Sequence, residues 1–111
     1  MGYIKHHAIV ITTWQEDLVP KLLASARELD LEVLSSGPTY INGYSTIIIL
    51  PDGSKEGWEE SDRGDSMRTL FKTRLQDFEY EDGSSPLEWV EVAYGSDDAR
   101  AVVTDDAWWR H

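Results

Sequence analysis

The segment His6-His7-Ala8-Ile9-Val10-Ile11-Thr12-Thr13, followed by Trp14-Gln15-Glu16, decides the fold. Its β-branched apolar residues predict a central strand that is covered on both faces. Thr13 and Glu16 have the spacing of a capping box, which predicts that a helix starts soon after the strand. We expect this helix to carry Pro20 in its first turn and to end near Asp30. The chain therefore begins with a β-α unit.

Further elements follow on the C-terminal side. Residues 31–36 and 47–50 are expected to be strands, and Asn42-Gly43 between them favours a tight type I′ hairpin. A second helix is expected from the spacing of apolar residues between Met67 and Phe78, with Asp62 or Asp65 as its cap. Residues 87–94 and 99–104 are expected to form the last two strands. The order β-α-β-β-α-β plus one C-terminal strand predicts one α+β domain over residues 1–111, a ferredoxin-like sandwich with both helices on one face of an antiparallel sheet.

Composition limits the function. The chain has 111 residues, no cysteine and a formal net charge of −11. The lack of cysteine excludes a disulfide scaffold, a cysteine nucleophile and an iron–sulfur site. A surface this acidic repels phosphate backbones, so direct binding of DNA or RNA is not expected. The start of the chain shows no signal peptide and no membrane-spanning run, and we expect a cytoplasmic protein.

The acids are concentrated in the second half. Between Asp77 and Asp98 there are eight acids and no Lys or Arg. This stretch could form an interface for a basic partner protein, or it could serve solubility alone. The candidate interface residues are Glu88, Glu91, Asp97 and Asp98.

Residues 51–65 are the strongest candidate site. They are expected to form a long polar loop that ends at a helix N-terminus, where free amide groups favour anions. Lys55, Arg63 and Arg68 could bind phosphate, Ser54 could add a hydroxyl, and Trp58 could stack on a base. Six acids in the same loop oppose an anion, and a solvated loop pinned by Trp58 is the alternative.

Two other features are candidate sites. His6 and His7 are adjacent on a strand and point to opposite faces, so they are unsuited to binding one metal together, although His7 could serve as a polar ligand contact. Asn42 and Tyr44 at the hairpin tip could read polar edges of a ligand, although such turns are mostly structural. No catalytic motif is present, and no cofactor or metal is expected.

The chain has five tryptophans. Trp14 and Trp89 are expected to pack in or beside the core. Trp108 and Trp109 follow the last expected strand, and they are expected either to fold back on the sheet or to form an interface in a homo-oligomer.

Several stretches resemble a family of small proteins of tailed bacteriophages that have no assigned activity. These stretches are Lys5-His6-His7-Ala8-Ile9-Val10, Ile41-Asn42-Gly43-Tyr44, residues 51–62 and residues 80–92. The resemblance implies a small accessory protein that works in the cytoplasm of an infected bacterium. It brings no catalytic residues.

Three functions remain open from the sequence. The first is a non-enzymatic protein that sequesters a small anionic ligand, such as a nucleotide immune signal, at the 52–65 loop and the hairpin. The second is an acidic inhibitor that imitates nucleic acid and binds a basic host or defence protein. The third is a metal-assisted hydrolase that uses His7 with loop acids.

Overall fold

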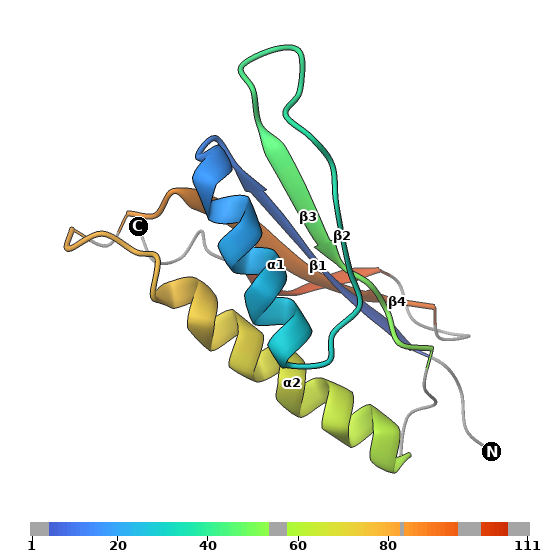
Figure 1. Cartoon of the computed structure of the whole chain (residues 1–111). Helices are drawn as coiled ribbons and strands as arrows, with labels where there is room; N and C mark the ends of the chain where they lie inside the picture. Colours follow the sequence, from blue (N-terminus) through green and yellow to red (C-terminus); the bar gives the residue numbers. More distant parts are fainter. Residues whose placement is uncertain (1–4, 54–57, 83, 96–100, 107–111) are drawn as a thin grey trace.

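The structure is a computed structural model, and it describes residues 5–53, 58–82, 84–95 and 101–106. Five strands and two helices follow in the order given in Figure 1. Their bounds are β1 His6–Thr13, a 3-10 turn Glu16–Leu18, α1 Val19–Glu28, β2 Val33–Ser35, β3 Ser45–Ile49, α2 Glu59–Gln76, β4 Leu87–Tyr94 and β5 Val102–Asp106.

The sheet has the strand order β2-β3-β1-β4-β5, and every neighbouring pair is antiparallel. This arrangement confirms the predicted α+β sandwich of ferredoxin-like type, with β5 as the additional strand beside β4. The central strand is β1, as predicted, but the prediction that it is covered on both faces was wrong, because both described helices pack on the same face of the sheet. Figure 1 shows α1 and α2 side by side in front of the sheet.

The core lies between the helices and one face of the sheet. Ile9 and Ile11 of β1 and Ile47 and Ile49 of β3 are fully buried there. Helix side chains fill the other half of this core, with Phe71 of α2 as the largest fully buried residue. Because side chains alternate along a strand, the residues between these isoleucines point to the opposite face.

The opposite face of the sheet carries a row of apolar side chains. Pairing places Leu34, Ile48, Val10 and Val90 in one line across β2, β3, β1 and β4. A second line continues beside it, through Ala8, Val92 and Val103. These seven residues define what we call the uncovered face, because both described helices pack on the other side. None of the seven belongs to the buried core cluster.

The connection between β2 and β3 forms a hairpin that projects beyond the helices (Figure 1). Its tip, residues 40–43, contains Asn42 and Gly43, both with φ of 64°. Positive φ at both positions is expected of a type I′ turn. The loop is nevertheless longer than the predicted tight turn, because the backbone hydrogen bond that closes it runs from the Thr39 amide N–H to the Tyr44 carbonyl at 2.8 Å and encloses residues 40–43. Tyr40 and Ile41 at the tip are 103% and 72% exposed.

Three local predictions were wrong. Helix α2 begins at Glu59, inside the segment expected to be a loop, and its N-cap is Trp58, which makes no side-chain cap bond. Thr13 does not form a capping box. Its hydroxyl accepts the amide N–H of Gln15 at 3.1 Å and donates to the carbonyl of Pro86 at 2.8 Å, so it ties β1 to β4 instead.

The two tryptophans expected near the core differ. Trp89 is buried on β4, as predicted, whereas Trp14 is 56% exposed just after β1. Within the described residues, neither helix is long and apolar enough to cross a membrane.

Candidate functional site

A cavity of about 380 Å³ lies between the turn from α1 to β2 and the first half of α2. Its apolar wall consists of Leu29, Leu31, Leu50 and Met67. Small-molecule sites in proteins begin at about this volume and combine an apolar wall with a few polar groups. Figure 1 shows the first part of α2 extending beyond the end of α1, and this part of α2 supplies one wall of the cavity.

Arg63 of α2 provides the accessible cation of this cavity. Its Nη2 lies 3.0 Å from Oδ2 of Asp30, and both side chains are mostly exposed, at 67% and 76%. Asp30 is the second residue after the end of α1, and its φ is 57°. An exposed ion pair of this kind contributes little to stability, so a ligand anion can replace Asp30 at small cost.

Arg68 is the second cation at the cavity, but its charge is already matched. The guanidinium is 6% exposed and contacts Asp65, and its Nη1 and Nε lie 3.8 Å from Asp52 and Glu91 respectively. A buried guanidinium with three carboxylate neighbours holds its position firmly. Arg68 therefore shapes the wall of the cavity and is not available to a phosphate.

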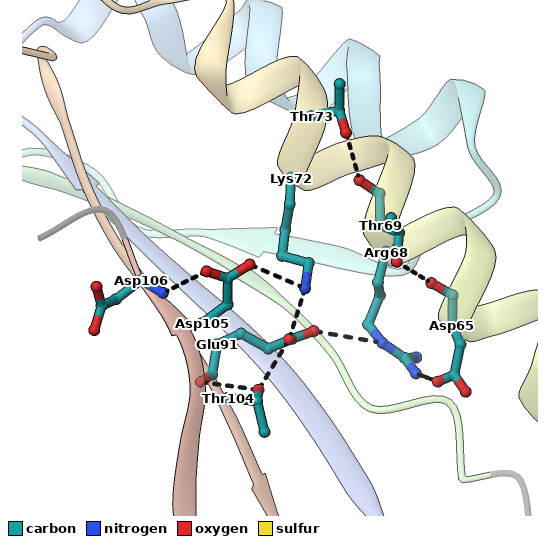
Figure 2. A network of polar contacts seen from close by, with 9 residues as sticks. All are labelled: Asp65, Arg68, Thr69, Lys72, Thr73, Glu91, Thr104, Asp105 and Asp106. Carbon is teal, nitrogen blue, oxygen red and sulfur yellow. Dashed lines mark hydrogen bonds and ion pairs between the residues drawn. The ribbon is translucent and has the colours of Figure 1, made fainter. Parts of the chain in front are cut away.

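The contacts of Arg68 are part of a larger network that joins α2 to β4 and β5 (Figure 2). Glu91 is at its centre, with Oε1 accepting from Lys72 at 2.9 Å and from the Thr104 hydroxyl at 2.9 Å. Lys72 also lies 3.3 Å from Asp105. Glu91 was predicted as an interface residue, and this was wrong, because the carboxylate is buried against α2.

Gly64 makes room for the polar wall of the cavity. A methyl group at this position would overlap the Asp52 carboxylate and would stand 3.2 Å from Nη1 of Arg68. A glycine inside a helix costs about 1 kcal/mol relative to alanine, so a packing reason is expected for it. Here the reason is the close approach of Asp52 and Arg68 to the helix.

The cavity carries more negative than positive charge. Asp30, Glu32, Asp52 and Glu60 line it together with the two arginines. The carboxylate groups of Glu32 and Glu60 have neither a hydrogen bond nor an ion pair in the part of the chain that the structure describes. A ligand with several phosphates would be repelled here, whereas one anionic group at Arg63 and N–H donors facing the carboxylates would be accepted.

The structure brings only some of the predicted ligand residues together. Arg63 and Arg68 line the cavity, and Trp58 stands exposed at the start of α2. Asn42 and Tyr44 lie on the projecting hairpin, at the opposite end of the molecule from the start of α2 (Figure 1), and His7 on β1 is not a lining residue. Ser54 and Lys55 fall outside the described residues.

The cavity also contains residues that sequence reasoning missed. Asp30 and Glu32 come from the α1–β2 turn, and Leu29 and Leu31 alternate with them. The signal was weak, because a short polar and apolar alternation after a helix is typical of any turn into a strand. These residues line a cavity because α2 packs against the α1–β2 turn, and a single sequence does not show this contact.

The remaining predicted interface residues differ in whether the structure describes them. Glu88 is exposed on β4, whereas Asp97, Asp98, Trp108 and Trp109 lie outside the described residues. Across the described ranges, no three His, Asp or Glu side chains are grouped as metal ligands.

The chain matches no protein-family model and no curated protein sequence. Among solved structures, it is similar to a phage SAM lyase in its apo state, with a TM-score of 0.41 and 15% sequence identity. The alignment covers 94% of this chain and 91% of that chain. A likeness of this strength supports no statement about the function of the chain.

Proposed function

We propose that the protein is a non-enzymatic binding protein that sequesters a small molecule in the cavity between α2 and the α1–β2 turn. The observation that carries the proposal is the combination of an apolar wall with Arg63, a cation whose one ion-pair partner among the described residues, Asp30, is exposed. The ligand would place a planar body against Leu31, Leu50 and Met67. It would place a single anionic group on Arg63.

The unpaired carboxylates refine the class of ligand. Glu32 and Glu60 accept hydrogen bonds, and the amino groups of nucleobases are suitable donors. A nucleotide with one phosphate has all three parts, namely a planar base, N–H donors and one anionic group. The resemblance to small phage proteins suggests the biological setting, in which such a ligand would be a nucleotide immune signal of the infected cell.

The first experiment is native mass spectrometry of the protein purified gently from a bacterial cytoplasm. Excess mass per subunit that is released as a nucleotide on denaturation would support the proposal and identify the ligand. The same preparation is then titrated with 5′-AMP, 5′-CMP and ATP, and binding is followed by amide NMR shifts. We expect shifts at the cavity residues with the monophosphates, and weaker binding of ATP because its additional charge meets the carboxylates.

Variants locate the binding. Arg63→Ala should weaken monophosphate binding at least tenfold, because it removes the accessible cation. Arg27→Ala is the matched control, since Arg27 is an exposed arginine on α1 that does not line the cavity. Met67→Trp should block binding by filling the cavity. Absence of co-purified mass together with absence of shifts at the cavity for all three nucleotides would refute the proposal.

A second function is favoured by exposed carboxylates in the acid-rich stretch, at Asp77, Glu81, Asp82 and Glu88. These would bind a basic host or defence protein in an inhibitor that imitates nucleic acid. Binding of this kind falls steeply with salt concentration and does not require the cavity. A captured basic protein that is released by salt, and retained by Arg63→Ala, would favour this function.

A further inference from the structure

Two apolar surfaces have no described helix packed on them, and they lie on different parts of the molecule. One is the hairpin tip, where Tyr40 and Ile41 are 103% and 72% exposed. The other is the uncovered face of the sheet, where Leu34 and Val103 at its two edges are 60% and 59% exposed and the valines and isoleucine between them are half-buried. Contiguous exposed apolar groups of this kind usually mark an interaction site.

The tip is held in one conformation by its own hydrogen bonds. The amide N–H of Thr39 donates to the carbonyl of Tyr44 at 2.8 Å, and the amide N–H of Tyr44 donates to the Thr39 hydroxyl at 3.0 Å. The same hydroxyl donates to the carbonyl of Ile41 at 2.6 Å. A preorganised loop loses little entropy on binding, so its exposed aromatic and aliphatic side chains are suited to anchor in a partner.

Both surfaces are free of charge at their centres. From Val33 to Pro51 the sequence has no Asp, Glu, Lys or Arg, and this segment contains β2, the tip and β3. On the uncovered face, the line from Leu34 to Val90 crosses four strands without a charged side chain, and Asp106 follows at its end.

The net charge of −11 limits the ways in which two copies of the chain can contact each other. Two copies of so acidic a chain repel each other through most of their surface. The tip and the uncovered face are the places where two copies can meet without setting carboxylates against carboxylates. A basic partner, by contrast, would gain nothing from uncharged surfaces and would bind the acidic ones.

We propose that the protein self-associates, and that the hairpin tip of one copy packs on the uncovered face of another. Tyr40 and Ile41 of one copy contact the line formed on the other copy by Leu34, Ile48, Val10 and Val90. The two contacting surfaces differ, so the contact repeats until the assembly closes on itself. This inference goes beyond the proposed function, because the cavity lies on the helix side of the sheet and takes no part in the contact.

The test is the mass in solution of the full chain, measured by sedimentation velocity over a range of concentrations. We expect the wild type to have a multiple of the 12.6 kDa subunit mass. Tyr40→Ser with Ile41→Ser should raise the dissociation constant at least tenfold, and the fold should remain intact because both side chains are exposed. Leu70→Ser is the matched control, since Leu70 is an exposed apolar residue on α2 and its loss should leave the assembly unchanged.

A mixing experiment separates tip-to-face contact from other modes. Val90→Lys disables the uncovered face, and Leu34→Lys is the second face variant, at a mostly exposed edge position that tolerates the change. Each face variant should be monomeric alone, yet should form a heterodimer with the tip variant, because one intact tip and one intact face remain. A monomeric wild type, a tip variant that still assembles, or folded variants that do not complement each other would each overturn the proposal.

Discussion

Nζ of Lys72 lies 2.9 Å from Oε1 of Glu91, on the side of the sheet that the helices cover. Both side chains are mostly buried, at 17% and 7% exposure. The same ammonium group lies 3.3 Å from Oδ2 of Asp105, and the Thr104 hydroxyl donates to Glu91. Strand β5 is therefore attached by polar contacts to α2 and β4, whereas the other strands are held by the apolar core.

Removing the centre of this network should destabilise the fold. Glu91→Ala leaves Lys72 and Arg68 without their shared carboxylate in a buried place, and such a change costs about 3 kcal/mol. The free energy of unfolding is measured by urea denaturation. The matched control is Glu28→Ala, which breaks the exposed pair between Glu28 and Arg74 at 2.8 Å and should cost less than about 1 kcal/mol. Equal losses in the two variants would contradict the buried role of Glu91.

Lys72→Met should loosen β5 selectively. The change removes the ammonium group that joins Glu91 to Asp105, while the methionine stem still covers the sheet. Amide hydrogen exchange should become faster in Val102–Asp106 and stay unchanged in Ser45–Ile49, because β3 is held by the apolar core. Uniform acceleration across the whole sheet would show that Lys72 supports global stability and does not specifically dock β5.

The strands of the core could be predicted because their sequence pattern matches their burial. In β1 and β4 the apolar residues are dense or alternate cleanly, and the predicted bounds 6–13 and 87–94 equal the observed ones. The start of α2 could not be predicted. Residues 59–66 are polar and contain Gly64. The buried residues in the first half of α2 are Ser61 and Arg68, so this half lacks the apolar stripe by which a helix is recognised in a sequence.

The site was less predictable than the fold for a related reason. Arg63 is predicted to be a ligand residue because of its charge, and it does line the cavity. Arg68 was selected on the same ground, but its three carboxylate neighbours come from the same helix, from the end of β3 and from β4. Contacts between such distant segments leave no signal in a single sequence, so the availability of a charge cannot be inferred from it.

Asp82 should titrate at unusually low pH. The Ser84 hydroxyl and the Ser84 amide N–H donate to Oδ1 of Asp82 at 2.6 and 2.9 Å, and these bonds hold the pKa of the carboxyl below its usual value of 3.8. Because the folded-state pKa is lowered, the stabilisation is present above pH 3.8 and is lost as the pH falls through the folded-state value. Ser84→Ala should raise the pKa of Asp82, measured by carbon NMR titration. Ser85→Ala, the adjacent serine, should leave it unchanged, and a shift in that variant would point to a general change in the turn.

Gly64→Ala should destabilise the protein although it adds a good helix former. At an open position inside a helix this substitution gains about 1 kcal/mol. Here the new methyl group meets the Asp52 carboxylate and Nη1 of Arg68, so a loss of about 1–3 kcal/mol is expected from overpacking. The double variant with Asp52→Ala removes the group that the methyl overlaps, and in that background Gly64→Ala should become neutral or stabilising. Thermal unfolding of the four proteins gives the coupling between the two sites. Additive effects would show that the Asp52 carboxylate does not contact the helix at Gly64, which would contradict the described arrangement of the polar wall of the cavity.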